Sequence, residues 1–278
     1  MWNKKIDEFL HCRGFIRLDA DHSIYTRRNG HLAIIALYVD DLILLTDSSE
    51  TMSELKLELT QAFEMTDCGE LHYFLGLRVQ RDRARRILTL NQGHFVDQIL
   101  TRFNMTDCHP VSTPLDPSVQ LKRSDGGGYD DNNNNNKETN YADETLFRQI
   151  IGSLMFLMIG TRPDIAAAVS IISQFSMKPT QEHYQAAKRI LRYLKGSANL
   201  KLYLGGISEA DKTLKLIGYS DANWGNDTDT RKSTTGYLFY LSGGVVSWSS
   251  KRQATVALSS TEAEYMALTH TTKESIWL

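Results

Sequence analysis

Two adjacent acids, Asp40 and Asp41, interrupt the apolar run LYVDDLILLT at residues 37–46. An unpaired carboxylate in a buried strand is costly, so the pair is expected at a turn between strands over 32–39 and 42–46. Two carboxylates about 4 Å apart repel by roughly 4 kcal/mol at an effective dielectric of about 20. Solvent at a polar turn offsets this repulsion, and so does Mg²⁺, which one or two carboxylates hold together with substrate phosphates. On these residues alone, a plain turn and a metal-binding turn for phosphoryl transfer both stay open.

Two further acids are weaker candidates. Asp221 ends the apolar strand in GYSDANWG, where a charge without a partner is unusual. Glu264 lies in the helix predicted for SSTEAEYMAL, and a solvated helix face is the ordinary interpretation of such a residue. Asp227 and Asp229 are nearby, in a predicted loop.

Two segments are candidates for binding rather than chemistry. The segment Phe74-Leu75-Gly76 is equally compatible with a plain strand that carries a glycine bulge. A basic stripe at i, i+4 and i+7 lies opposite an apolar face that includes Tyr184 and Leu191, and it is either a solvated face or a surface that follows a phosphate backbone. The stripe consists of Lys188, Arg192 and Lys195.

Composition limits the class of protein. The chain has 278 residues and a formal net charge of −2, so a nucleic-acid partner requires a local basic patch. The three cysteines show neither a CxxC motif nor a paired histidine, which indicates free thiols in a reducing compartment. The N-terminus lacks an apolar signal core, and the longest apolar stretch, 150–160, is shorter than the roughly 20 residues of a membrane span. We therefore expect an intracellular protein that is neither secreted nor embedded in a membrane.

The N-terminal half shows alternating strand and helix signals. Asn29-Gly30 is a hairpin signal. Thr51 with Glu54 has the spacing of a capping box at the start of a helix. Alternating apolar residues predict one half-buried strand over 71–79, and a basic turn follows, before a short helix over 92–103.

The C-terminal half begins with a break. Residues 110–140 are rich in proline and asparagine and predict a flexible linker. Three helical patterns follow, and the last ends at Gly196. Residues 213–250 then predict three antiparallel strands in chain order, with Gly243-Gly244 as a turn and a helix packed on one face. The three helical patterns cover residues 143–159, a segment that opens at Pro163, and residues 181–195.

The order of the motifs resembles one known family. YVDD between two apolar strands resembles the YxDD hairpin of reverse transcriptases. FEMTDCGELHYFLGLRV, GSLMFLMIGTRPDIAAAVSIISQF and HYQAAKRILRYLKGS are similar to later segments of the polymerase of copia-type retrotransposons. GYSDANWG, RKSTTGYLF and SSTEAEYMAL are similar to the ribonuclease H domain of that family. The resemblance to a copia-type Pol polyprotein covers nearly all residues except 124–137.

The resemblance implies an α+β fold in several parts. Residues 1–110 would be the C-terminal part of a polymerase palm, built from antiparallel hairpins and a helix, with the primer-grip hairpin and the start of the thumb. Residues 111–140 would be the linker, and 141–205 a helical thumb or connection. Residues 213–278 would be the N-terminal part of a ribonuclease H-like domain.

The resemblance also implies roles for the candidate residues. Asp40 and Asp41 match the metal-binding pair of the palm, and Tyr38 matches a residue near the primer end. Phe74, Leu75 and Gly76 match the primer grip. Asp221 and Glu264 match two acids of the ribonuclease H cluster. The implied cofactor is Mg²⁺ in two-metal sites, and the implied partners are an RNA template, a DNA primer, an RNA–DNA hybrid, dNTPs and the remaining Pol segments.

The chain also departs from the family pattern. No residue here matches the third palm acid or the later ribonuclease H acids, so each metal cluster is expected to be incomplete and the chain inactive on its own. The family setting implies a cytoplasmic location with access to the nucleus. The alternative function is that of a non-catalytic nucleic-acid-binding remnant of a decayed or co-opted element.

Overall fold

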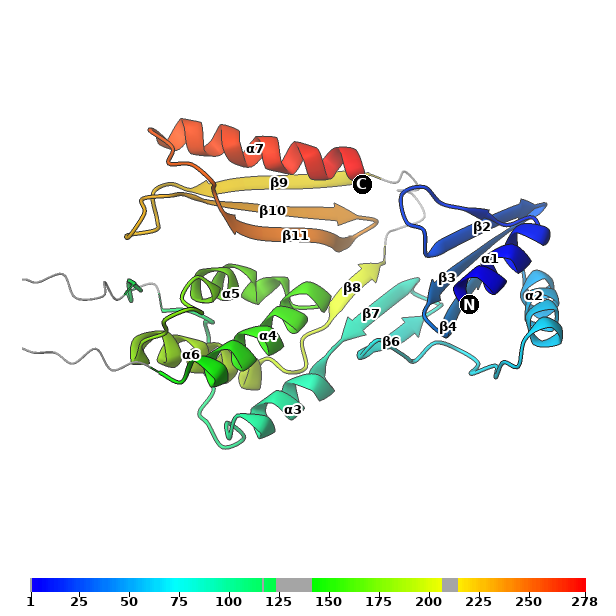
Figure 1. Ribbon diagram of the computed structural model, residues 1–278, viewed down its shortest axis with the longest axis horizontal. Helices are drawn as coiled ribbons and strands as arrows, with labels where there is room; N and C mark the ends of the chain where they lie inside the picture. Colours follow the sequence, from blue (N-terminus) through cyan, green and yellow to red (C-terminus); the bar gives the residue numbers. More distant parts are fainter. Residues whose placement is uncertain (1, 117, 124–141, 207–214) are drawn as a thin grey trace, which may run out of the picture. The chain divides into compact units, whose positions relative to one another are not determined.

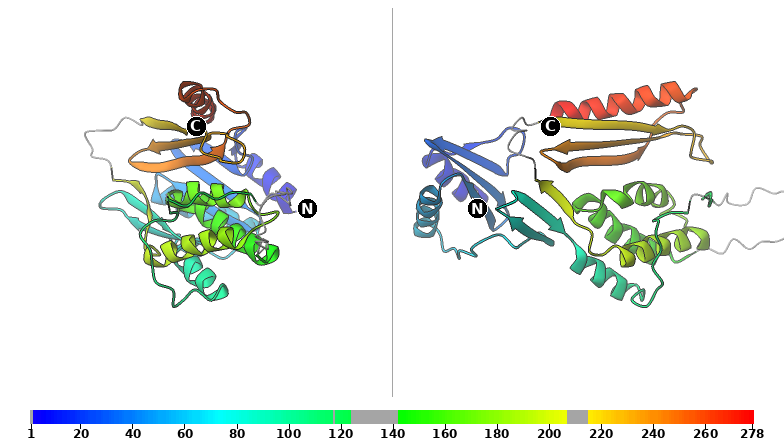
Figure 2. Two further views of the ribbon diagram at one scale, coloured as in Figure 1. Left: turned by 90° about the vertical axis from the view of Figure 1, so that its left-hand side faces the viewer. Right: turned by 180° about the vertical axis from the view of Figure 1, so that it is seen from behind.

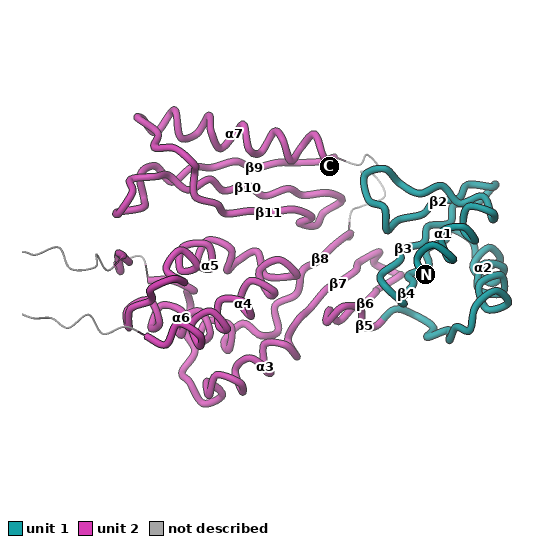
Figure 3. The backbone as a smooth tube through the Cα atoms, viewed as in Figure 1, with its two compact units in different colours: residues 1–71 teal, residues 72–278 magenta. Residues whose placement is uncertain are grey.

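The computed structural model describes residues 2–116, 118–123, 142–206 and 215–278 (Figure 1). The chain divides into two compact units, residues 1–71 and 72–278 (Figure 3). The flexible linker was predicted for residues 110–140. Its part from residue 124 to residue 140 lies outside the described residues.

The first unit is an antiparallel four-stranded sheet with two helices on one face. In the central strand, Ala33, Ile35 and Leu37 alternate with less buried residues, so one face of the sheet is apolar and buried. Those side chains pack against the buried residues of the two helices, among them Ile6 and Leu55. In chain order the elements are α1 (Trp2–Cys12), β1 (Ile16–Arg17), β2 (Ile24–Asn29), β3 (His31–Tyr38), β4 (Asp41–Thr46) and α2 (Ser49–Ala62).

Helix α2 begins earlier than the capping box predicts. The N-cap is Ser48, whose backbone is extended and whose hydroxyl oxygen accepts a hydrogen bond from the N–H of Thr51 at 3.3 Å. Thr51 is therefore inside the first turn, and its pairing with Glu54 as a capping box is wrong. Asp47, just before Ser48, is engaged elsewhere, because its carboxylate accepts a hydrogen bond from the N–H of Leu32 at 3.1 Å.

The second unit starts with a small sheet that corrects another prediction. Residues 71–79 do not form one strand, because the chain reverses at Leu75 and Gly76, whose φ angles are +50° and +80°. Positive φ at both central residues is typical of a type I′ hairpin turn, and glycine adopts it without steric cost. The sheet order is β5 (Tyr73–Phe74), β6 (Leu77–Asp82), β7 (Ile87–Asn91) and β8 (Leu202–Gly205). Strand β8 lies within the segment that was expected to be helical.

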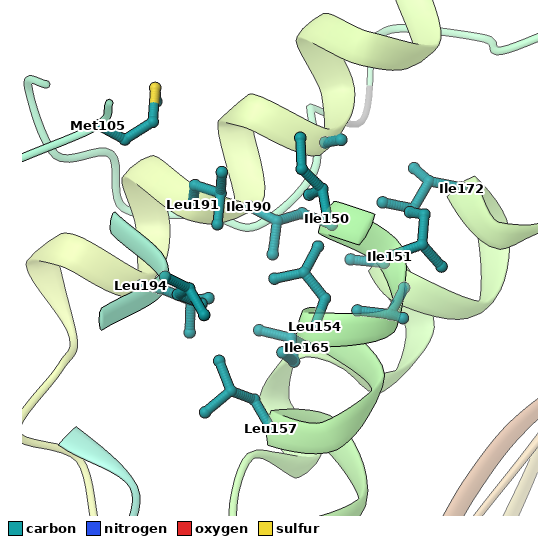
Figure 4. Close-up of a cluster of buried hydrophobic side chains, with 14 of the residues drawn as sticks. Met105, Ile150, Ile151, Leu154, Leu157, Ile165, Ile172, Ile190, Leu191 and Leu194 are labelled. Carbon is teal, nitrogen blue, oxygen red and sulfur yellow. The ribbon is translucent and has the colours of Figure 1, made fainter. Parts of the chain in front are cut away.

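Four helices form the apolar centre of this unit. Figure 4 shows side chains of one of them, including Ile150 and Leu154, facing Ile190 and Leu194 of another. The helices are α3 (Gly93–Arg102), α4 (Glu144–Gly160), α5 (Ala166–Ser173) and α6 (Gln181–Gly196). The predicted helices are confirmed with two changes at their ends. Pro163 opens a short 3-10 turn that leads into α5, and Gly196 is the last helical residue rather than a left-handed cap.

The last segment has the predicted antiparallel topology. Its strands are β9 (Leu216–Asn223), β10 (Thr234–Leu241) and β11 (Gly244–Arg252), paired in the order β11-β10-β9. Helix α7 (Ser260–Trp277) packs on one face of this sheet, as the views in Figures 1 and 2 agree. The turn between β10 and β11 is Ser242-Gly243, one residue before the predicted Gly243-Gly244.

The fold is therefore mixed α and β with antiparallel sheets, in agreement with the predicted α+β class. The division into palm, thumb and ribonuclease H parts stays a prediction. Among the residues that the structure describes, no helix is long and apolar enough to cross a membrane.

Candidate functional site

The YVDD segment forms a tight hairpin. Tyr38 and Asp41 are paired across β3 and β4, so only Val39 and Asp40 make the turn. Val39 has a φ of +53°, whereas Asp40 keeps a negative φ. A positive φ at the first turn residue is the type II′ pattern, in which glycine is preferred. A β-branched residue in this conformation is strained, and such strain is often found at functional sites.

Strand alternation places the polar side chains of this hairpin. Leu37 is buried and Leu42 packs against the core of α1 and α2, so their neighbours Tyr38 and Asp41 face the other side of the sheet. Tyr38, Asp40 and Asp41 are all exposed. The hairpin thus presents two adjacent carboxylates to solvent, with an aromatic ring on the same face as one of them.

A tryptophan from the N-terminal helix holds this turn. The indole Nε1–H of Trp2 donates a hydrogen bond to the carbonyl oxygen of Val39 at 2.7 Å. The ring of Trp2 packs edge-on against Phe63, with centroids 5.2 Å apart. Sequence reasoning missed Trp2, because no local pattern links residue 2 to residue 39.

The donor set at the hairpin suits a hard cation that is shared with a substrate. Carboxylate oxygens are preferred ligands of Mg²⁺, which commonly uses one or two of them together with phosphates and water. Within the described ranges, no group of three or more His, Cys, Asp or Glu side chains is placed to hold a metal ion. Asp40 and Asp41 therefore fit a site that substrate oxygens complete, and they do not fit a closed site made only of protein ligands.

The Phe74-Leu75-Gly76 segment is a hairpin turn and not a strand with a bulge. Leu75 and Gly76 are the two turn residues, and Leu75 is exposed. A Cβ at Gly76 would lie 3.3 Å from Cζ of Phe156, a residue of α4. This glycine is thus needed for its positive φ and for close approach to a helix.

The basic stripe of α6 proves to be engaged by the protein itself. Nε of Arg192 donates to the carbonyl of His109 at 2.7 Å, and Nζ of Lys195 donates to the carbonyl of Thr106. Lys188 lies over the ring of Tyr184, 4.8 Å from its centroid, so the expectation that Tyr184 lies opposite the stripe is wrong. These residues are one helical turn apart and share a face.

The stripe is therefore not a solvated face. Lys188, Arg192 and Lys195 are all half-buried, and two of them fasten the segment after α3 onto α6. The carbonyl acceptors of Arg192 and Lys195 are neutral, so these hydrogen bonds pair neither side chain with an anion. Sequence reasoning missed these contacts because every residue has a backbone carbonyl, so the sequence does not show which carbonyl accepts a hydrogen bond.

Asp221 lies in β9, and Glu264 lies in α7, which packs on the sheet that contains β9. The hydroxyl of Thr271 in α7 donates to Oγ of Ser220 at 2.9 Å, so Ser220 faces α7 and its neighbour Asp221 faces away. Asp221 lines a cleft of about 590 Å³ together with Trp248 and residues at the start of α5. Glu264 is exposed on α7, beside the buried Ala263.

The loop acids Asp227 and Asp229 have structural partners. Asp227 forms an ion pair with Arg252 at 2.6 Å, and it accepts backbone hydrogen bonds from Asp229 and Thr230. Burial alone would raise the pKa of Asp227, but Arg252 and these N–H groups together hold it below the ordinary value. Asp229 accepts a hydrogen bond from the backbone N–H of Arg123.

Comparison with known proteins decides the family. The family model "Reverse transcriptase (RNA-dependent DNA polymerase)" matches residues 1–117. The retrovirus-related Pol polyprotein from transposon TNT 1-94 of Nicotiana tabacum is 40% identical over 279 residues, which cover 100% of this chain and 20% of that protein. The Pol polyprotein from transposon RE1 of Arabidopsis thaliana is also 40% identical, over 100% of this chain and 18% of its own length. The putative transposon Ty5-1 protein YCL074W of Saccharomyces cerevisiae is 32% identical, over 99% of this chain and 84% of its own length.

The chain belongs to the reverse transcriptase family of copia-type transposon Pol polyproteins. It spans about a fifth of the length of the TNT 1-94 and RE1 relatives. The part of this Pol segment that the family model matches contains both hairpin turns, YVDD and Phe74-Leu75-Gly76. The α6 stripe, Asp221 and Glu264 lie beyond the matched residues. No solved structure matches the chain.

Proposed function

We propose that this chain is part of an RNA-directed DNA polymerase in which Asp40 and Asp41 hold the catalytic Mg²⁺. The observation that carries the proposal is the hairpin geometry, because one exposed carboxylate lies in a two-residue turn and a second follows it directly, in the part that the reverse transcriptase model matches. The partners are an RNA template, a DNA primer, an incoming dNTP and the remaining Pol segments. The site of action is the cytoplasm, with access to the nucleus.

The residues of the hairpin act by position. When bound, Mg²⁺ neutralises charge on the phosphoryl group that is transferred and orients the attacking and leaving oxygens. Asp40 and Asp41 provide its protein ligands, and the strained turn, held by Trp2, fixes their direction before substrate arrives. Tyr38, on the face of Asp41, contacts the primer end in this proposal. The tight turn at Leu75-Gly76, with Phe74 before it, holds the primer strand.

The same Pol segment carries candidate acids for hydrolysis of RNA in an RNA–DNA hybrid, Asp221 and Glu264. A shared Mg²⁺ requires carboxylate oxygens about 4 Å apart, as its ligands lie about 2 Å from the ion. In this proposal Asp221 of β9 and Glu264 of α7 share one Mg²⁺, and the remaining Pol segments supply further ligands. Lys188, Arg192 and Lys195 remain candidates for contact with the hybrid backbone, because their acceptors are uncharged.

A second candidate function is binding without catalysis. It is favoured by the finding that, in the parts of the chain described, no three acids gather at one point. Two-metal phosphoryl transfer usually requires more carboxylates than the pair at each location here. We infer that residues 1–278 alone neither extend a primer nor cut a hybrid.

The deciding experiment uses a Pol polyprotein that contains this segment. Mg²⁺-dependent incorporation of dNTPs on an RNA template with a DNA primer is measured for the parent and for Asp40→Asn/Asp41→Asn. Incorporation should fall at least a thousandfold in the variant. Asp19→Asn, an exposed acid of the same unit, is the matched control and should retain parental activity. Parental activity in the double variant would overturn the assignment, and incorporation by residues 1–278 alone would overturn the inferred inactivity.

A further inference from the structure

One face of the β5–β8 sheet carries exposed aromatic and basic side chains. On the packed face lie the buried Val79 and Leu202, together with the less exposed Leu77 and Leu90. Residues paired across antiparallel strands share a face, so the register defines what the opposite face contains. Thr89, at the centre of this face, is buried between its neighbours. The face consists of Tyr73, Arg78, Gln80, Asp82, Ile87, Thr89, Asn91 and Tyr203, with Lys201 just before β8.

Aromatic and basic side chains share this face. Tyr73 is paired with Arg78, and Thr89 is paired with both Gln80 and Tyr203. The two tyrosines are each 55% exposed, which is high for large rings on a sheet. They lie three strands apart, and a strand spacing of about 4.8 Å puts roughly 14 Å between them across the sheet.

The charge of this face is positive. Arg78 and Lys201 are both exposed, and neither forms an ion pair with a carboxylate among the described residues. Nζ of Lys201 donates instead to Oε1 of Gln80 at 2.7 Å, which links β8 to β6. The segment RVQRDRARR, residues 78–86, carries five arginines and one acid, Asp82, which lies 3.8 Å from Arg85.

We propose that this face binds an unpaired nucleic-acid strand, with bases stacked on Tyr73 and Tyr203 and phosphates beside Arg78 and Lys201. Exposed rings on a basic surface are the arrangement that binds single strands, since every base has a flat face that an aromatic ring can cover. A duplex hides those faces within its own stack and offers only its backbone. The positive charge suits any nucleic acid, and the exposed rings favour a single strand over a hybrid, because only unpaired bases can stack on them.

This face is distinct from the primer-end contacts proposed above. Phe74 follows Tyr73 in β5 and therefore points to the opposite side of the sheet. Binding here requires neither Asp40 and Asp41 nor a metal ion, so the inference goes beyond the proposed polymerase function. A binding experiment in EDTA tests it separately, because failure there leaves the polymerase assay unaffected.

The test measures binding of a fluorescent 12-nucleotide oligo(dT) and of an RNA–DNA hybrid of equal length to residues 1–278, by anisotropy in EDTA. We expect tighter binding of the single strand. Tyr203→Ala and Tyr73→Ala should each weaken it about tenfold, and Tyr203→Phe should retain it, since stacking needs the ring and not the hydroxyl. Tyr265→Ala, a 67% exposed tyrosine on α7, is the matched control and should bind normally.

The charged residues have their own readout. Arg78→Ala and Lys201→Ala should each reduce the slope of log K against log salt by about 0.7, the value for one phosphate of a single strand. Lys273→Ala on α7 should leave the slope unchanged. A method that needs no variant is ultraviolet crosslinking of a 5-iodouracil oligonucleotide to the unmodified chain, which should mark Tyr73 or Tyr203. Equal binding of hybrid and single strand, full affinity in both tyrosine variants, or crosslinks confined to other elements would overturn the proposal.

Discussion

The two pairs of candidate acids are positioned by different means. Asp40 and Asp41 are neighbours in sequence, and one hairpin turn sets the direction of both carboxylates. Asp221 and Glu264 belong to a strand and a helix, so their separation depends on how α7 lies on the sheet. That packing is set by small contacts, such as the bond of Thr271 to Ser220 and the bond from Nε2 of Gln253 to the carbonyl of Ala263.

The two pairs of acids therefore differ in how many substitutions would change their geometry. A site within one hairpin changes only when the turn or its support changes, whereas a site between two packed elements changes with every residue of the interface. Changes in the α7 interface should therefore affect the C-terminal sheet strongly and leave the YVDD hairpin intact, because the hairpin belongs to the other compact unit.

The largest effect is expected from a charge placed under α7. Ala267 is fully buried against the sheet, so Ala267→Asp should destabilise the C-terminal sheet by about 3 kcal/mol or more. Hydrogen exchange should show lost protection in β9 and β10 and unchanged protection in β3 and β4. Leu268→Asp, one residue along and 51% exposed, should change little. Equal loss of protection in β9–β10 and in β3–β4 would contradict the expectation that α7 affects only the C-terminal sheet.

A smaller effect should depend on pH. The pKa of Asp227 is lowered in the folded chain, so its contribution to stability is complete above the unfolded value of about 3.9 and is lost as the pH falls toward the folded value. Asp227→Asn should therefore reduce stability by about 1–3 kcal/mol at pH 7, and the difference from the parent should shrink below about pH 4. Urea unfolding at both pH values measures this.

Asp221→Asn is the control for that experiment. Asp221 is exposed, and no hydrogen bond or ion pair holds its carboxylate among the described residues, so its replacement should cost less than about 0.5 kcal/mol at pH 7. A difference between Asp227→Asn and the parent that persists unchanged at pH 3 would remove the Arg252 pair as the cause.

The same distinction explains what could be predicted from the sequence. The YVDD hairpin, the Asn29-Gly30 turn and the three C-terminal strands follow from local alternation and turn residues. The reversal at Leu75-Gly76 was missed because the alternation of apolar residues continues through it, and only the glycine signals the turn. The face on which Asp221 lies depends on register and packing, which local patterns do not encode.

Removal of the support of the YVDD turn should have a moderate effect. Trp2→Phe keeps an aromatic ring against Phe63 but loses the Nε1–H donor to Val39, which should cost about 1 kcal/mol. Amides at residues 39–41 should exchange faster, and β9 should be unaffected. Trp277→Phe, at an exposed tryptophan of α7, is the matched control and should leave the hairpin amides unchanged.

The smallest effect should come from the turn residue itself, with the opposite sign. Val39 has a φ of +53°, and strain of this kind costs about 1–3 kcal/mol. Val39→Gly removes that strain, but the unfolded chain gains freedom that offsets about 0.5–1 kcal/mol of it. We therefore expect a net stabilisation of about 0.5 kcal/mol, measured by hydrogen exchange of the amides in β3 and β4. In the Pol polyprotein the same variant should incorporate dNTPs more slowly, because a relaxed turn directs Asp40 and Asp41 less firmly. If Val39→Gly were destabilising and fully active, the strain would have no role in positioning the carboxylates.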